Sequence, residues 1–188
     1  MIRIGIVGDI GSGKSHLARL FGYPVFNADV EVAKLYKKNK KCYLKLKKIL
    51  PNYVKSFPVK KKEISKAILK NSGNLKKIVR IIHPMVRKSM NLFLKKNKNN
   101  KFVVLDIPLL LENKLNKKKD IIIFIDAKKK DINKKLKKKY NNNLKIVKRM
   151  RKFQLPIEVK RKRSDFTIKN NFKNKSAKIN VKKVMKFF

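Results

Sequence analysis

Residues 8–15 read Gly-Asp-Ile-Gly-Ser-Gly-Lys-Ser, with the spacing G-x-x-x-x-G-K-S, and they directly follow an apolar run over residues 2–7. Glycines at these positions let the backbone curl so that its N–H groups point inward at an anion. The lysine can reach the outer phosphates of a nucleotide, and the serine hydroxyl can ligate Mg²⁺. This pattern predicts a phosphate-binding loop between a strand and a helix, with a nucleoside triphosphate as its ligand.

The loop predicts nucleotide contacts but leaves the acceptor of the phosphoryl group open. Kinases, GTPases and motor ATPases all share such a loop, so the acceptor has to be inferred from the rest of the chain. The residues expected to contact the nucleotide here are Gly11, Ser12, Gly13, Lys14, Ser15 and His16.

Length and cysteine content restrict the class of protein. The chain has 188 residues, which is enough for one domain and too few for two ordinary ones. Its single cysteine, Cys42, excludes an internal disulfide framework and a cysteine metal cluster. No apolar run approaches the ~20 residues of a membrane span, and the first strand leads into the loop without the features of a secretory signal. We expect a cytoplasmic protein that binds no membrane.

The net charge of +43, from 54 Lys+Arg against 11 Asp+Glu, has two explanations. It could belong to a nucleic-acid-binding surface. It could also reflect a genome rich in A/T codons, which explains why asparagine and isoleucine are abundant together with lysine. The lysine runs lack the interleaved aromatic residues of specific nucleic-acid binders. We therefore expect no specific nucleic-acid partner, and only salt-sensitive, non-specific adhesion to RNA.

Apolar segments that alternate with helical spacing predict an α/β fold with a parallel sheet. Residues 31–99 contain no convincing strand and predict a helical insertion, and the core is expected over about 1–30, 100–140 and 160–188. Residues 141–155 interrupt the pattern, as either a lid over the nucleotide or an ordinary surface loop. The predicted strands are residues 2–7, 25–27, 102–105, 121–125 and 166–168, and helices are expected over 16–21, 128–140 and 173–188.

Polar residues follow several of the predicted strands. Asp29 comes after the second strand, Asp106 after the third and Asn170 after the fifth. Ligands of open parallel sheets bind outside the carboxyl ends of the strands. We therefore expect these side chains and the phosphate loop to share one rim of the sheet.

Five further segments follow the loop in order over nearly the whole chain: residues 27–29 (Asn-Ala-Asp), 82–87 (Ile-His-Pro-Met-Val-Arg), 106–112 (Asp-Ile-Pro-Leu-Leu-Leu-Glu), Arg149 with 154–156 and Lys160, and 164–170 (Ser-Asp-Phe-Thr-Ile-Lys-Asn). In this order they resemble the D-A-D, I-H-P-x-V-R and D-x-P-L-L-x-E motifs, the lid with its following helix, and the A-D-F-x-I-x-N motif of the dephospho-coenzyme A kinases, the enzymes of the last step of coenzyme A synthesis.

The resemblance implies a P-loop kinase-type three-layer fold with a helical substrate-binding insertion and a small lid. It also implies transfer of the γ-phosphoryl group of ATP to the ribose 3′-hydroxyl of dephospho-coenzyme A, with Mg²⁺ as cofactor. The expected partner is this small-molecule substrate, and the expected state is a monomer or a small homo-oligomer. The alternatives are a basic P-loop ATPase acting on nucleic acid and another nucleotide or metabolite kinase.

The resemblance also implies roles for two carboxylates. Asp29 is the candidate base for the attacking hydroxyl, although it could instead cap the following helix. Asp106 is a candidate Mg²⁺ ligand together with Ser15, and also a candidate substrate contact; alternatively, it could accept hydrogen bonds from the phosphate loop. Glu112 is given no definite role, and Pro108 and the three leucines after it are interpreted as packing, without a chemical role.

His83 and Arg87 are assigned to the rim of the acceptor pocket, where Arg87 could form a bidentate contact with a pyrophosphate. His83 could equally have a purely structural role at a helix start, because Pro84 follows it and favours the first helical turn.

Arg149 is the predicted lid cation and a candidate catalytic residue, with Lys148 and Arg151 as alternatives. Asn170 is expected to border the adenine, and Asn171 is an equal alternative.

The chain departs from the family pattern in places. Asn27 replaces the usual first acidic residue, and His16 stands where the loop normally ends in threonine. Arginines expected before the lid are lysines, around Lys135 and Lys139, and lysine lacks the planar fork of arginine. These changes predict reduced turnover.

Overall fold

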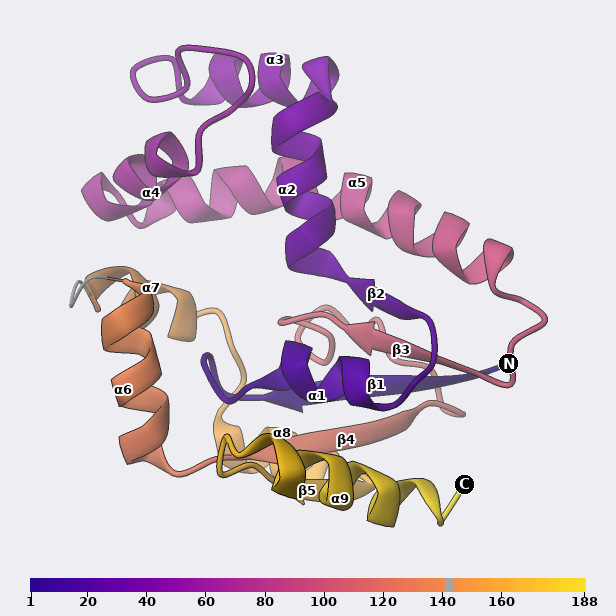
Figure 1. The fold of residues 1–188 in the computed structure, drawn as a ribbon. Helices are drawn as coiled ribbons and strands as arrows, with labels where there is room; N and C mark the ends of the chain where they lie inside the picture. Colours follow the sequence, from indigo (N-terminus) through magenta and orange to yellow (C-terminus); the bar gives the residue numbers. More distant parts are fainter. Residues whose placement is uncertain (141–143) are drawn as a thin grey trace. The chain divides into compact units, whose positions relative to one another are not determined.

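A parallel five-stranded sheet organises the chain, in a computed structural model that describes residues 1–140 and 144–188 (Figure 1). Its strand order is β2-β3-β1-β4-β5. Each pairing is parallel, which confirms the predicted α/β fold with its five strands. The strands are β1 (Ile2–Gly8), β2 (Val25–Asn27), β3 (Phe102–Asp106), β4 (Ile121–Asp126) and β5 (Phe166–Lys169).

The chain forms two compact units. The first contains Met1–Asn27 and Asn97–Phe188, and the second contains Ala28–Lys96. The sheet lies in the first unit, and the second is helical throughout its regular structure. The helices of the first unit are α1 (Lys14–Leu20), α6 (Lys129–Lys139), α7 (Lys145–Arg151), α8 (Ile157–Lys162) and α9 (Asn174–Met185).

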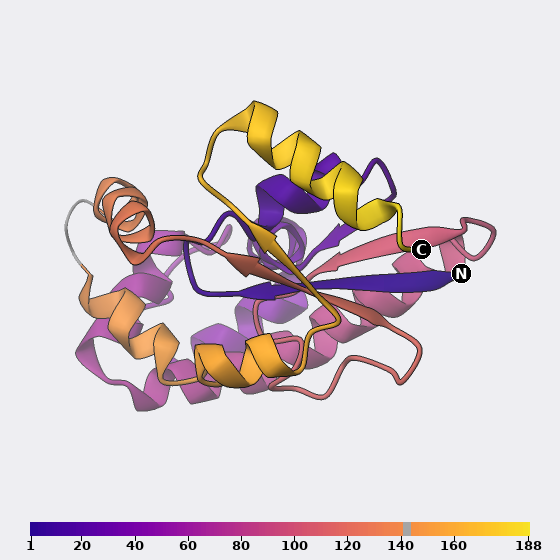
Figure 2. The same cartoon turned by 90° about the horizontal axis from the view of Figure 1, so that it is seen from below.

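The core of the first unit surrounds β1, whose residues after Ile2 are all buried. A central parallel strand is covered on both faces, which explains the continuous apolar run that the sequence shows there. Figure 2 shows α1 and α9 on one face of the sheet and α8 on the other. Because β1 lies between β3 and β4, the loop that follows it is held at the middle of the sheet edge. The buried cluster includes Ile4, Ile6, Leu17, Phe102, Val104, Ile123 and Val181.

The second unit is a group of helices in which α5 contacts the other three. Apolar residues three and four positions apart, such as Ile64, Ala67 and Ile68, are buried in it, as the helical spacing predicted. The Asn39 side chain caps the second helix of this unit by accepting a hydrogen bond from the Cys42 N–H at 2.8 Å. Its helices are α2 (Ala28–Lys38), α3 (Lys40–Ile49), α4 (Lys61–Lys70) and α5 (Gly73–Lys96).

The prediction that a helix starts at His83 is wrong, because α5 continues through this residue with Pro84 in its interior. An interior proline removes one backbone hydrogen bond and usually kinks or ends a helix. Here Ile78 before the proline and Ile82 beside it are buried against the rest of the unit. Burial of this apolar face outweighs the local preference of the proline.

None of the helices in residues 1–140 and 144–188 is both long enough and apolar enough to cross a membrane.

Candidate active site

The phosphate loop passes directly from β1 into α1. Gly13 occupies the N-cap position of α1 at φ 90°, a left-handed conformation that favours glycine. A Cβ atom at Gly13 would collide with the side-chain nitrogen of Asn170 and would approach the Phe172 ring to 3.3 Å. The segment after β5 therefore lies so close to this turn that glycine is required there.

Gly13→Ala is expected to lower the free energy of unfolding by about 1–3 kcal/mol, because alanine adds backbone strain and displaces Asn170. Urea unfolding of the variant measures this loss. Gly22 also has positive φ, but a Cβ there would meet no atom within 4 Å. Gly22→Ala is the matched control, which isolates the backbone strain; an equal loss in both variants would contradict a role for the Asn170 contact.

The side chain of Lys14 folds back over its own loop. Its Nζ donates hydrogen bonds to the backbone oxygen of Gly8 at 3.2 Å and of Asp9 at 2.7 Å. This contact keeps the ammonium group on the loop, where the predicted phosphates would bind. Ser12 is completely buried, and its hydroxyl has no hydrogen-bond partner among the residues that the structure describes.

Asn170 connects the loop to the segment after β5. Its side-chain nitrogen donates to the Ser12 backbone oxygen at 2.8 Å, and its side-chain oxygen accepts from the Phe172 N–H at 3.0 Å. The Asn171 side chain is instead exposed and donates to Ser176. Of the two candidates for the nucleotide site, Asn170 is therefore the one in contact with the phosphate loop. Its predicted place beside the adenine stays a prediction.

Ser15, Asn27 and Asp106 come together from α1, β2 and β3. The Asn27 amide donates to the Ser15 hydroxyl at 3.4 Å and also to the carboxylate of Asp106, its partner in the strand register. Asp106 is only 3% exposed. The predicted pair of oxygen ligands is thus joined through Asn27. Oxygen donors of this kind suit Mg²⁺, with phosphate oxygens and water as its remaining ligands.

Asp29 lies in the first turn of α2, in the second unit, two residues after Asn27 along the chain. The helix already begins at Ala28, so the alternative that Asp29 is its N-cap is wrong. The Asp29 side chain is exposed. A carboxylate in a first helical turn lies near the positive end of the helix dipole.

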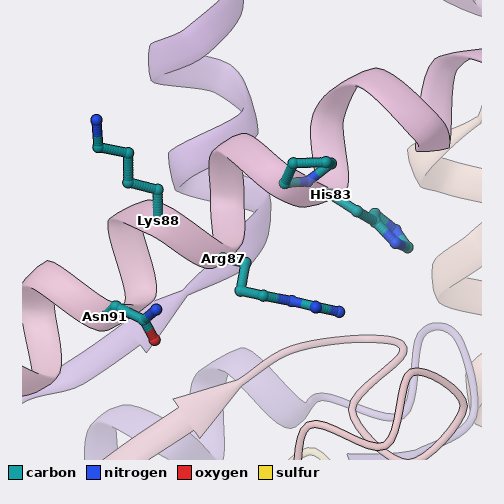
Figure 3. Close-up of a pocket in the computed structure, with 5 residues that line it drawn as sticks. His83, Arg87, Lys88 and Asn91 are labelled. Atoms are coloured by element: carbon teal, nitrogen blue, oxygen red, sulfur yellow. The ribbon is translucent and has the colours of Figure 1, made fainter.

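His83 and Arg87 line one pocket on α5, with a volume of about 360 Å³ (Figure 3). Pro84, Lys88 and Asn91 complete its lining. Burial, and then the positive charge of Arg87, lower the pKa of His83 below its ordinary value of 6.5. Arg87 and His83 point to the same side of α5, whereas the Lys88 ammonium points away from them (Figure 3). The pocket therefore presents the Arg87 guanidinium beside a histidine that stays neutral near pH 7, a combination suited to an anionic ligand.

The lowered pKa of His83 has a consequence for stability. As pH falls below about 6.5, the unfolded chain gains a proton at this histidine more readily than the folded chain does, so the free energy of unfolding decreases. We expect His83→Gln to remove the part of this decrease that is due to His83. Urea unfolding at several pH values on both sides of 6.5 measures the free energy of unfolding of each protein. If this free energy depended on pH identically in both proteins, the burial effect on His83 would be contradicted.

The structure describes the predicted lid from residue 144 onward; Asn141, Asn142 and Asn143 lie outside the described residues. The predicted lid cation Arg149 lies on α7. Arg151, the last residue of that helix, forms an ion pair with Asp9 of the phosphate loop, with Nη2 to Oδ2 at 2.7 Å. This contact was not predicted, since residues 142 positions apart show no local pattern.

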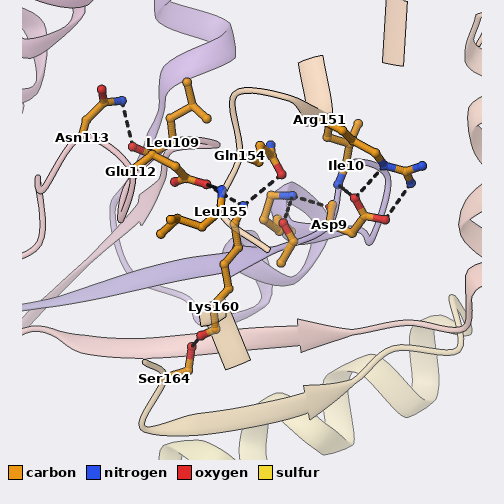
Figure 4. Close-up of polar contacts among 12 residues, drawn as sticks. Asp9, Ile10, Leu109, Glu112, Asn113, Arg151, Gln154, Leu155, Lys160 and Ser164 are labelled. Atoms are coloured by element: carbon orange, nitrogen blue, oxygen red, sulfur yellow. Dashed lines mark hydrogen bonds and ion pairs between the residues drawn. The ribbon is translucent and has the colours of Figure 1, made fainter. Parts of the chain in front are cut away.

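Glu112 has a structural role that was not predicted. Its carboxylate accepts from the Leu155 N–H and from Lys160 Nζ, both at 2.9 Å (Figure 4). Lys160 is 1% exposed and also donates to the Gln154 side chain at 2.9 Å. Glu112 thus holds the segment after α7 onto the loop after β3. The only signal in the sequence was that these residues belong to the motifs of the resemblance.

Comparisons with known proteins agree on a family. The family profile described as dephospho-CoA kinase matches residues 2–176. The dephospho-CoA kinase of Bartonella quintana is 35% identical over 170 residues, which cover 88% of this chain and 87% of that protein. The protein of the same name from the Wolbachia of Brugia malayi is 33% identical, with the same coverage. A shorter match, to Zymomonas mobilis dephospho-CoA kinase, is 34% identical and covers 60% of this chain and 58% of that protein.

Solved structures show the same fold. TT1252 from Thermus thermophilus has a TM-score of 0.79 at 26% identity, covering 99% of this chain and 96% of that one. Dephospho-CoA kinase from Campylobacter jejuni has a TM-score of 0.63 at 24% identity, covering 98% and 95%. Shikimate kinase from Acinetobacter baumannii has a TM-score of 0.57 at 14% identity, covering 100% and 92%. These neighbours confirm the predicted P-loop kinase-type fold.

Proposed function

The chain belongs to the dephospho-CoA kinase family, and from this membership we propose that it transfers the γ-phosphoryl group of ATP to the ribose 3′-hydroxyl of dephospho-coenzyme A. The cluster of side chains around the phosphate loop is the main observation that supports this proposal. Lys14 lies over the loop, Asn170 holds the loop backbone, and Asp106 lies within reach of Ser15 through Asn27. Such a cluster suits a bound triphosphate whose terminal group is transferred.

The nucleotide end of the reaction depends on positioning and charge. Phosphoryl transfer passes through a loose transition state, so little covalent chemistry is required of the protein. We assign the triphosphate to the backbone of Gly11, Ser12 and Gly13, with Lys14 neutralising its outer phosphates. His16 follows in the first turn of α1 and is assigned to the edge of the same site.

Ser15 and Asp106 would hold Mg²⁺ in this proposal. When bound, Mg²⁺ neutralises charge on the triphosphate and orients its terminal phosphate. The Asn27 amide between the two side chains keeps their oxygens on the same side of the sheet edge. Asp106 is buried, so its carboxylate stays fixed as the phosphates arrive.

The acceptor end is assigned to Asp29 and the α5 pocket. Asp29 takes the proton of the 3′-hydroxyl while that oxygen forms a bond to the γ-phosphorus and the bond from phosphorus to the ADP oxygen breaks. Arg87 is suited to bind the pyrophosphate of dephospho-coenzyme A by its planar fork. Neutral His83 lines the same pocket and can donate or accept one hydrogen bond there.

Arg149 is assigned to the lid, where its charge would stabilise the transferring group. The protein is further proposed to act in the cytoplasm, as a monomer or small homo-oligomer, without a specific nucleic-acid partner. Its high positive charge would then be a feature of composition.

Release of ADP tests this proposal. The protein is incubated with MgATP and, in parallel, with dephospho-coenzyme A, AMP, shikimate or single-stranded RNA. We expect ADP release that depends on dephospho-coenzyme A and is not stimulated by RNA. Release that RNA stimulates, with no response to dephospho-coenzyme A, would instead support the alternative of a nucleic-acid-dependent ATPase.

A further inference from the structure

The carboxylate of Asp9 is unusual for its place, because it lies inside a loop that is expected to bind an anion. It is nearly buried, with 11% of its side chain exposed. Its Oδ1 accepts the N–H of the next residue, Ile10, at 2.7 Å. A negative charge here would repel a triphosphate unless a cation compensates it.

Arg151 supplies that cation. Its Nε donates to Asp9 Oδ1 at 3.2 Å and its Nη2 donates to Oδ2 at 2.7 Å, so the contact is bidentate (Figure 4). Such a fork fixes the orientation of the guanidinium as well as its distance. It occupies Nε and one hydrogen of Nη2, so that the group retains further N–H donors for another anion.

Asp9 also anchors the other cation of the loop. Its backbone oxygen accepts Lys14 Nζ at 2.7 Å, while its carboxylate holds Arg151. One residue thus joins an ammonium group from α1 to a guanidinium from the end of α7. Both cations therefore lie next to the loop.

We propose that Asp9 is a positioning residue, which holds Arg151 on the phosphate loop so that its guanidinium donates to the bound triphosphate. Arginine has many rotamers, and ordering it in advance removes an entropic cost from nucleotide binding. This inference rests on the proposed nucleotide site and adds to it a second lid cation, distinct from Arg149. Asp9 itself does not contact the phosphates; it acts through Arg151.

A double-mutant cycle on MgATP affinity, measured by calorimetry, tests this coupling. Asp9→Asn keeps the size of the side chain and the oxygen that accepts from Ile10, but removes the charge and the bidentate fork. Arg151→Gln removes the cation. We expect each single variant to bind MgATP about tenfold more weakly, the usual effect of losing one charged hydrogen bond. The double variant should bind MgATP no more weakly than Arg151→Gln does, because Asp9 supports binding only through Arg151 and, without that cation, its charge only repels the triphosphate.

Two outcomes would overturn the proposal. In the first, Asp9→Asn binds MgATP as tightly as the unchanged protein, or more tightly, so that Asp9 only repels the nucleotide. In the second, the losses multiply to about a hundredfold in the double variant, so that the residues act independently. Lys152→Gln removes a neighbouring exposed charge and should leave the affinity unchanged.

Two further measurements separate this role from general stability and from the proposed function. Melting temperatures are recorded for every variant. If the ion pair only stabilised the fold, its loss would lower the melting temperature, and the two substitutions would show no coupling in MgATP affinity. Arg151→Lys keeps the charge without the fork and should bind at least about threefold more weakly; equal affinity would contradict the proposal. Because binding is measured without an acceptor, failure to phosphorylate dephospho-coenzyme A would contradict the proposed function and leave this result intact.

Discussion

Changing Asp29 to asparagine is expected to reduce kcat by about 10² to 10⁴-fold, the usual contribution of a positioned general base. Asparagine keeps the shape of the side chain but cannot take the proton of the attacking hydroxyl. The KM for ATP should change little, since Asp29 is assigned to the acceptor. Steady-state kinetics with MgATP and dephospho-coenzyme A measure both quantities.

Glu31→Gln is the matched control for this prediction. Glu31 is also an acidic residue in the first turn of α2, and its carboxylate pairs with Lys34 on the surface. Its loss should leave kcat within about twofold, because exposed pairs of this kind contribute little. If Asp29→Asn kept full activity, or if both variants lost activity equally, Asp29 would not be the base.

Lys160→Met is expected to lower the free energy of unfolding by about 3–5 kcal/mol. Methionine fills a similar volume, but it leaves the Glu112 carboxylate without the cation at 2.9 Å. An unpaired charge in a nearly buried site is strongly unfavourable. Urea unfolding at neutral pH measures the loss.

The partly exposed ion pair between Arg161 and Asp126 provides the control for the buried one. Arg161 lies on the same helix as Lys160, α8, whereas Asp126 ends β4, and the two side chains are 40% and 32% exposed. Arg161→Gln should cost at most about 1 kcal/mol, because water screens such a pair. Should Lys160→Met unfold no more easily than Arg161→Gln, the contact between Lys160 and Glu112 would not hold the segment after α7.

Much of the fold could be predicted from local patterns in the sequence. The phosphate loop has a fixed spacing of residues, and the buried strands are continuous apolar runs, so both are visible without any partner. The helix through Pro84 was missed because the proline argues locally against it, whereas the burial of Ile78 and Ile82 depends on neighbouring helices. Tertiary packing thus overrode a local preference.

The candidate site was predictable to the extent that its residues follow strands or belong to motifs. Ser15, Asp106 and Asn170 meet around the loop because parallel strands end at one edge of the sheet. The contacts of Asp9 with Arg151 and of Glu112 with Leu155 span 142 and 43 residues. No local spacing encodes such pairs, since they depend on where α7 and the loop after β3 are placed by the fold.

Mass spectrometry of the reaction products shows whether this chain phosphorylates dephospho-coenzyme A. The protein is incubated with MgATP and dephospho-coenzyme A, with AMP present as a competing acceptor. We expect coenzyme A, which is dephospho-coenzyme A with one phosphoryl group added to its 3′-oxygen, and ADP to form in equal amounts. Consumption of ATP with dephospho-coenzyme A left unmodified, or phosphorylation of AMP in its place, would contradict this expectation.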